Sequence, residues 1–239
     1  MASLQQYQTI LYEVQEACKQ LSLPIPGGVF DVSGETPLLM GSLANLAGTL
    51  LADNYRWQHL QKKWTIPGDS VTTQWPLPTD FASVVDNTGW DVPLGRKCFV
   101  LNPQQWAEIE NNSTPSSFVP VCRVYQDFME FMTPPTGNVR FQYKVRNWVI
   151  DGETQQTKSF LTKNADVPKF DWLMMVIALK VKWLESKNMN TLAAQSDLND
   201  RYNQLTQKDG TAPTLYLSGS RLADDRLINE LNTPANLGF

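Results

Sequence analysis

The sequence has very little of the two residue types that most often build metal and redox sites. Histidine occurs once, as His59, near the expected end of a helix, where a surface or capping role is the ordinary one. Cysteine occurs three times, as Cys18, Cys98 and Cys122. These cysteines lie far apart, are odd in number and form no CxxC pair, which argues against a disulfide framework and a zinc site. We therefore expect reduced thiols, no metal site and no bound cofactor.

The chain also lacks the local motifs of the common enzyme classes. It contains no Gly-rich phosphate loop, no GxSxG nucleophile elbow and no cluster of metal ligands. Asp127 and Glu130 are three residues apart, and on a strand they would point to opposite faces and share no substrate. Asp197, Asp200 and Asp209 do not have the spacing of a calcium loop. No catalytic residue is assigned, and we expect that the protein is not an enzyme.

Neither sign of charge dominates the chain. It has 20 Lys and Arg residues against 24 Asp and Glu residues, a formal net charge of −4 and a pI near 5.1. This balance gives no global attraction to nucleic acid or anionic lipid. The apolar run from Trp172 to Leu179 ends at Lys180, far short of the roughly 20 residues that span a membrane. The first eight residues do not resemble a signal peptide, so we expect synthesis in the cytoplasm and no membrane partner.

Four segments have the apolar spacing of helices. In the first, the apolar residues recur at steps of three and four: Leu4, Tyr7, Leu11, Val14, Cys18 and Leu21. The second is expected to begin with Thr36 as its cap and carries a cluster of Gly and Ala. These small residues indicate close packing, either inside one bundle or against another subunit. The third is expected over 168–187, apolar on every face and capped by Asp166, and the fourth over 191–208.

The middle of the chain changes to the short, β-branched pattern of strands. Its clearest strand covers Val139 to Val145, where apolar and polar residues alternate. The expected partner is Asp127 to Met132, joined through a prolyl turn with Gly137 and Asn138 as in a hairpin. Other strands are expected over 63–67, 70–75, 83–86, 98–101 and 118–125, and a brief helix over 103–109.

Together these segments predict an α+β fold. Residues 1–64 and 166–208 are expected to supply two N-terminal and two C-terminal helices of one antiparallel bundle. Residues 65–165 are expected to form an inserted, antiparallel β-rich section. Residues 209–239 are rich in Gly, Pro, Ser and Asn, and only 221–231 has helical spacing. This last segment is expected to be an extended C-terminal arm, with a tail of no fixed structure as the alternative.

The clearest strand also carries a basic face. Arg140, Lys144 and Arg146 alternate with its apolar residues, and Lys158 and Lys163 are possible additions. Such a face is able to contact DNA phosphates. It has no interleaved aromatic residues of the kind that stack on single-stranded bases. An ordinary solvated strand face is the alternative.

Three stretches, in this order along the chain, resemble the head-to-tail adaptor proteins of tailed bacteriophages, of the tail tubular protein A type. Residues Trp75 to Phe81 are similar to that family's LP.DF element. Residues Phe131 to Tyr143 are similar to its F.P.P hairpin, and Val167 to Leu173 lead into a helix that is similar to the first of its C-terminal pair. The resemblance extends roughly from Thr36 to Leu205.

This resemblance implies a structural virion protein with no enzymatic activity. Such adaptors form a ring, commonly a dodecamer, beneath the portal protein. They extend the DNA channel, through which double-stranded DNA passes, and they provide the platform for a tail tube or nozzle protein. The expected location is the neck of the virion, after assembly in the host cytoplasm. The apolar residues of the arm would then bind the portal: Leu215, Tyr216, Leu217, Leu222, Leu227, Ile228, Leu231 and Phe239.

Three other readings stay open. The first is another neck or tail completion protein at a different ring position. The second is a nucleic-acid-binding module that uses Arg140, Lys144 and Arg146. The third is a cell-wall hydrolase, although no carboxylate pair in the sequence favours it.

Overall fold

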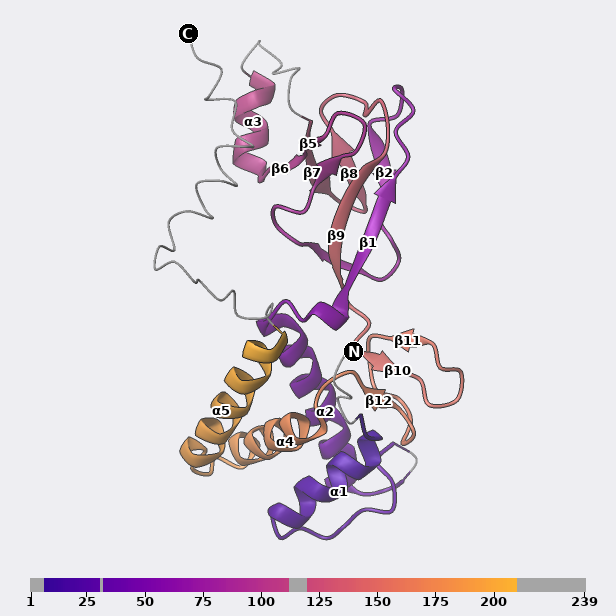
Figure 1. The fold of residues 1–239 in the computed structure, drawn as a ribbon. Helices are drawn as coiled ribbons and strands as arrows, with labels where there is room; N and C mark the ends of the chain where they lie inside the picture. Colours follow the sequence, from indigo (N-terminus) through magenta and orange to yellow (C-terminus); the bar gives the residue numbers. More distant parts are fainter. Residues whose placement is uncertain (1–6, 31, 112–119, 210–239) are drawn as a thin grey trace. The chain divides into compact units, whose positions relative to one another are not determined.

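The computed structural model describes residues 7–30, 32–111 and 120–209. The fold is mixed α+β, with five α-helices and several small, mainly antiparallel sheets in the described part of the chain. The chain divides into two compact units. A helical unit combines residues 7–61 with 145–209, and a β unit comprises the described residues of 62–144 (Figure 1). The expected arm over 209–239 lies outside the described residues, apart from its first residue.

Helix α1 (Ile10–Gln20) begins the helical unit. Thr9 caps it, since its hydroxyl accepts a hydrogen bond from the amide of Tyr12. Only part of the expected apolar stripe is buried. Val14 and Cys18 are buried, whereas Leu11 is half-buried. The buried stripe also includes the acidic Glu13, which the hydrophobic pattern does not show.

Helix α2 (Glu35–Asn54) buries its Gly and Ala residues together with Met40, Leu43 and Leu51. Gly34, not Thr36, occupies the position before its first turn, and no side chain caps that end. An added Cβ at Gly48 would lie 2.1 Å from Cη2 of Trp148. The Gly and Ala cluster is thus closely packed within the helical unit itself. Leu46 and Leu50 face solvent and are 48% and 37% exposed.

Helix α4 (Trp172–Ser186) is the core element of the helical unit and packs against α1, α2 and α5 (Leu192–Asp209). Most of its apolar side chains are buried, as its sequence predicts. The prediction of Asp166 as its cap is wrong. Asp171 is the N-cap, accepting from the amide of Met174 at 3.1 Å, and Pro168 belongs to a strand. Helix α5 is amphipathic and buries little more than Ala194 and Leu205.

A small antiparallel sheet of β11, β10 and β12 belongs to the helical unit. Its strands are Val149–Ile150 (β10), Thr157–Lys158 (β11) and Val167–Pro168 (β12). The loop between β11 and β12 is bonded to both N-terminal helices. Asn45 of α2 exchanges two hydrogen bonds with the backbone of Leu161, and the amide of Ile10 donates to the carbonyl of Asp166. These bonds explain why residues 145–165 join the helices, although the sequence pattern placed them in the β-rich section.

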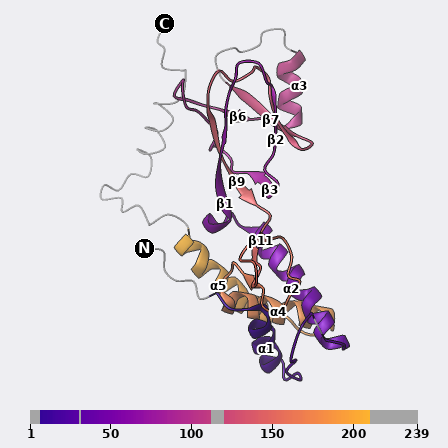
Figure 2. The ribbon, with the colours of Figure 1, turned by 90° about the vertical axis from the view of Figure 1, so that its right-hand side faces the viewer.

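The β unit consists mainly of two sheets. One has the order β1-β9-β4-β5, with β3 also paired to β9, and the other has the order β2-β8-β7-β6. Their strands are Gln61–Ile66 (β1), Gln74–Pro76 (β2), Phe81–Val84 (β3), Trp90–Asp91 (β4), Arg96–Lys97 (β5), Phe99–Val100 (β6), Val121–Tyr125 (β7), Phe128–Phe131 (β8) and Val139–Val145 (β9). Strands β1 and β9, by which the chain enters and leaves this unit, lie side by side (Figures 1 and 2).

The predicted hairpin between β8 and β9 is wrong, although both strands exist. Strand β8 pairs with β2 and β7, and β9 lies in the other sheet. The two strands instead contribute to one hydrophobic core, where the rings of Phe131 and Phe141 are 6.4 Å apart. Burial of both aromatic faces outweighs the local turn preference of the Pro134–Asn138 segment. Helix α3 (Pro103–Asn111) forms as predicted, and Asn102 caps it by accepting from the amide of Gln105.

Candidate functional site

The described residues contain no group of three His, Cys, Asp or Glu side chains that is able to hold a metal ion. In the same part of the chain, no helix is long and apolar enough to cross a membrane. The features that remain as candidates are surfaces, buried charges and a pair of thiols.

His59 packs among aromatic rings in the helical unit. It lies in a 3-10 turn (Gln58–Leu60), and its ring centroid is 5.8 Å from that of Trp57 and 6.0 Å from that of Phe170. Burial is the main cause that lowers the pKa of His59, so its ring is neutral at pH 7. A packing role therefore replaces the expected surface or capping role.

The helical unit has an open groove between α2, α4 and α5, with a volume of about 290 Å³. Its apolar lining comes from all three helices: Ala47, Leu50 and Leu51 from α2, Ala178 and Val181 from α4, and Leu198 from α5. Lys182 and Glu185 also line it and form an ion pair of 2.8 Å. Of the two α2 leucines in this lining, Leu50 is exposed and Leu51 is buried.

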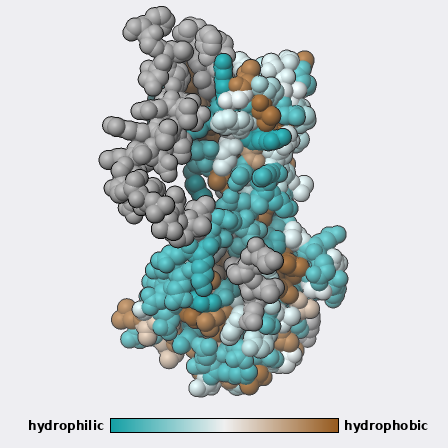
Figure 3. Space-filling model, viewed as in Figure 1, coloured by the Kyte–Doolittle hydropathy of each residue, from teal (hydrophilic) through white to brown (hydrophobic). Residues whose placement is uncertain are grey.

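The turn that joins α4 and α5 is a second apolar feature of the helical unit. Met189 and Leu192 are 57% and 73% exposed. Figure 3 shows hydrophobic atoms gathered over this turn, surrounded by a mostly hydrophilic surface. Exposed large apolar groups that cluster in this way mark contact surfaces more often than isolated ones do.

The outer face of the sheet β2-β8-β7-β6 carries exposed aromatic rings in the β unit. Tyr125 and Phe128 face each other across β7 and β8 and are 48% and 38% exposed. On the neighbouring strand β6, Phe99 is 43% exposed and pairs with Val121. Tyr and Phe are enriched at the centres of protein interfaces, so this face is the strongest candidate surface of the β unit.

An arginine organises that face. The Arg123 guanidinium lies over the ring of Trp106 from α3, 4.3 Å from its centroid, and over the ring of Tyr125, 4.7 Å from its centroid. Its Nε donates to Glu130 at 2.6 Å, and Gln74 donates to the same carboxylate at 3.1 Å. The stack therefore attaches α3 to the sheet and holds Tyr125 in place.

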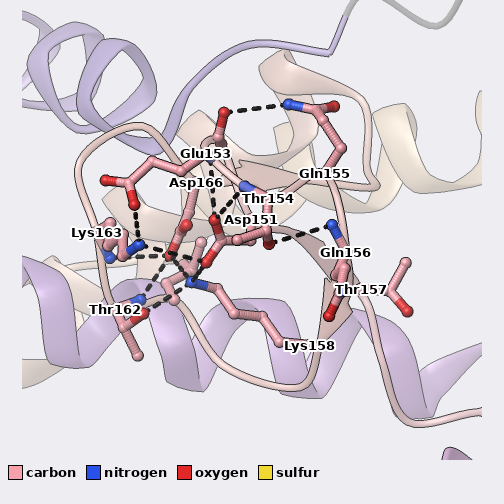
Figure 4. Close-up of polar contacts among 12 residues, drawn as sticks. Asp151, Glu153, Thr154, Gln155, Gln156, Thr157, Lys158, Thr162, Lys163 and Asp166 are labelled. Carbon is pink, nitrogen blue, oxygen red and sulfur yellow. Dashed lines mark hydrogen bonds and ion pairs between the residues drawn. The ribbon is translucent and has the colours of Figure 1, made fainter.

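A polar network shapes the loop between β10 and β12 (Figure 4). The ammonium of Lys158 lies between Asp151 and Asp166, 2.9 Å and 2.8 Å from their nearest oxygens. Asp151 also accepts from the amides of Glu153 and Thr154. The bond from Thr154, followed by those from Lys158 and Glu153, holds the pKa of Asp151 well below the ordinary range. Lys163 pairs with Glu153 and lies near Asp151. Lysine ammonium groups thus neutralise the acids, and the network is a structural brace of the loop.

A buried acid lies where α1, α4 and α5 meet. Both carboxylate oxygens of Glu13 are buried without a hydrogen-bond partner. Burial, followed by the charge of Asp171, raises the pKa of Glu13 well above its ordinary value. Asp171 itself is held by Arg201 of α5, with contacts of 3.0 Å and 2.8 Å. Sequence reasoning missed Glu13, although its position three residues after Ile10 and four before Ala17 placed it in the apolar stripe.

The residues proposed to face DNA are not equally placed. Arg140 and Arg146 are exposed, whereas the side chain of Lys144 is buried, with 9% of the residue exposed. Lys158 is committed to its two aspartates. The basic surface on β9 is therefore smaller than the sequence pattern indicates. The residues proposed to bind the portal, Leu215 to Phe239, lie outside the described residues.

No protein-family model matches the chain, and no curated protein matches it.

Proposed function

We propose that the protein is a head-to-tail adaptor of a tailed bacteriophage. In this proposal it forms a ring of twelve copies beneath the portal protein. The ring extends the channel through which double-stranded DNA passes, and it carries the tail tube or nozzle protein. The protein acts through its interfaces and not through catalysis, and its place is the neck of the virion.

The observation that carries the proposal is the insertion of the β unit into the helical unit. Residues 62–144 separate α1 and α2 from α4 and α5, yet α4 packs against α1, α2 and α5. We infer that these four helices act as one antiparallel bundle, which forms the body of the ring. This order of segments agrees with the family that the sequence motifs resemble.

Exposed apolar surfaces on both units support the proposal, because an adaptor must contact its own copies and two different partners. We assign the groove between α2, α4 and α5 to contact between neighbouring copies, since it is the apolar hollow of the helical unit. The aromatic face around Tyr125 and Phe128 is assigned to the tail-side partner. Residues 221–239 are assigned to the portal.

Light scattering of the purified protein, alone and mixed with its cognate portal ring, tests the proposal. We expect a monomer that gains the mass of a ring only when the portal is present. Replacing Leu222, Leu227, Ile228 and Leu231 with alanine should abolish this capture. Replacing Asn229 and Asn232 with alanine should leave it unchanged, which controls for alteration of the same segment. A wild-type protein that ignores the portal would contradict the adaptor function.

A second pair of variants tests the groove. Leu50→Glu, at an exposed residue that lines the groove, should leave the monomer folded and still able to bind the portal, but should reduce the number of copies per portal. Ser42→Glu adds the same charge at an exposed position of α2 and should have no effect. Complete rings from Leu50→Glu would show that the groove is not the contact between copies.

DNA binding through β9 is the less supported function. The net charge is −4, and Lys144 is buried. Salt-sensitive binding of duplex DNA that disappears in the double variant Arg140→Gln and Arg146→Gln would favour it over the adaptor.

A further inference from the structure

Two thiols face each other inside the β unit. The Sγ atoms of Cys98 and Cys122 are 3.7 Å apart, and the two residues are 3% and 0% exposed. The separation in sequence is 24 residues, so this proximity is a product of the fold. The third cysteine, Cys18, is buried in helix α1 of the helical unit.

The backbone holds these thiols in register. Strand β6, which directly follows Cys98, pairs in parallel with β7, and Val100 is opposite Cys122. The amide of Cys98 donates to the carbonyl of Gly89, and the amide of Leu101 donates to the carbonyl of Cys122. Both sulfurs lie in the same hydrophobic cluster. A disulfide requires an S–S distance of about 2.05 Å, so side-chain rotation with a small backbone adjustment has to bring the sulfurs closer.

Cys98 borders a surface cavity of the β unit. Cys98 lines a cavity of about 180 Å³, together with Asn87, Gly89, Lys97 and Phe99. Cys122 is fully buried, and its hydrogen bond with Cys98 and its burial raise its pKa well above the ordinary value. A small neutral oxidant such as hydrogen peroxide is therefore expected to meet Cys98 first.

We propose that Cys98 and Cys122 form an oxidisable dithiol, with Cys98 as the attacked residue and Cys122 as the resolving residue. The thiolate of Cys98 attacks one oxygen of hydrogen peroxide, the O–O bond breaks, and the released hydroxide takes up a proton as water. Cys98 is now a sulfenic acid. The sulfur of Cys122 attacks that of Cys98, the S–O bond breaks, and the hydroxyl leaves with the thiol proton as a second water. Two thiols have lost two electrons in total, and one peroxide has become two waters.

The disulfide would close a loop that contains α3 and joins β6 to β7. Restricting the unfolded chain in this way stabilises the folded state. A protein that is assembled with reduced thiols and later exposed to oxidants would thus gain resistance to unfolding in its β unit. This chemistry does not depend on the proposed assembly role, since it concerns only the two thiols.

Thiol counting on the full-length native protein tests the proposal. After treatment with hydrogen peroxide, removal of the oxidant and denaturation, the number of free thiols should fall from three to one, and dithiothreitol should restore three. The mass should fall by two hydrogens, and the cross-linked peptides should contain Cys98 and Cys122. The oxidised protein should also unfold at a higher urea concentration than the reduced protein. Three remaining thiols, over-oxidised products without a cross-link, or a cross-link to Cys18 would overturn the proposal.

Variants separate the two roles. Cys18→Ser is the matched control and should still lose two thiols. In Cys122→Ala, the sulfenic acid of Cys98 should accumulate and be trapped by dimedone. In Cys98→Ala, dimedone labelling of Cys122 should be at least ten-fold lower. Equal labelling in the two variants would contradict the assignment of Cys98 as the attacked residue. Because the thiol count uses the wild-type protein, the proposal stays testable if a variant does not fold.

Discussion

At the scale of single residues, the helical unit contains an acid, Glu13, whose charged form it cannot stabilise. Glu13 is fully buried, accepts no hydrogen bond, and lies near the Asp171 carboxylate. An ionised carboxylate in that position would be strongly unfavourable, so the folded protein holds Glu13 protonated. Arg201 does not neutralise Glu13, because its Nε and Nη2 groups donate to Asp171 instead.

The pH dependence of stability follows from this residue. The pKa of Glu13 is raised in the folded state, so the folded protein binds a proton that the unfolded chain releases above its ordinary pKa of 4.5. The contribution of protonated Glu13 to the free energy of unfolding is therefore fully present below pH 4.5. It is lost as the pH rises through the folded pKa, by up to about 1.4 kcal/mol per pH unit.

The variant Glu13→Gln should remove this dependence. We expect it to match the wild type near pH 4 and to exceed it increasingly in free energy of unfolding toward neutral pH, as measured by urea unfolding across that range. Glu16→Gln, on the same helix but paired with Lys19 at the surface, is the control and should show no such divergence. A constant difference between Glu13→Gln and wild type at every pH would show that folding does not raise the pKa of Glu13.

At the scale of elements, α2 shows how packing decides which face of a helix is buried. Its sequence offers large leucines and a row of Gly and Ala, and a reading by hydrophobicity alone favours the leucines as the core. The structure buries only some of them: Leu43 and Leu51 lie in the core, whereas Leu46 is exposed. Gly48 is buried against Trp148. Close approach of a large ring is possible only where no Cβ intervenes, so the small residues determine the orientation.

The contact between Gly48 and Trp148 predicts the effect of adding one methyl group at position 48. In Gly48→Ala the new Cβ would lie 2.1 Å from Cη2 of Trp148, which forces the ring or the helix to move. We expect a loss of roughly 1–3 kcal/mol in the free energy of unfolding, although alanine favours a helix by about 1 kcal/mol.

Urea unfolding, followed by tryptophan fluorescence, measures that loss. Gly27→Ala is the control, because an added Cβ at Gly27 meets nothing within 4 Å, and its effect should stay within about 0.5 kcal/mol. An equal or higher stability of Gly48→Ala would mean that Trp148 does not rest on α2.

At the scale of the whole molecule, the two units are connected by neighbouring strands. The chain enters the β unit through β1 and leaves it through β9, and these strands are hydrogen-bonded to each other. The ends of the insertion therefore lie about 5 Å apart where the strands pair. Because its two ends are neighbours, the β unit can be inserted while residues 61 and 145 of the helical unit stay close together.

Excision of the β unit tests whether the helical unit folds by itself. Replacing residues 62–144 with a Gly/Ser linker of about six residues should leave a helical circular dichroism spectrum and cooperative urea unfolding. The packing of α4 against α1, α2 and α5 involves no residue of the removed segment. A product without cooperative unfolding would show that the helical unit needs the β unit to fold.

Much of the local structure was predictable from the sequence. The spacing of apolar residues located all four long helices, the Asn102-Pro103 pair located α3, and alternation located β9. The mixed α+β class follows from these elements. Local spacing has this power because helices and strands are stabilised largely by groups a few residues apart or by one buried face.

Other features were decided only by the tertiary structure. The partner of β8, the buried face of α2, the cap of α4 at Asp171, and the position of residues 145–165 in the helical unit all depend on contacts between segments far apart in the chain. The same holds for the Arg123 stack, the buried Glu13 and the meeting of Cys98 with Cys122. The physical reason lies in the free energies involved. Burying large side chains and pairing buried charges contribute more to the stability of the fold than the local preferences that a sequence pattern records.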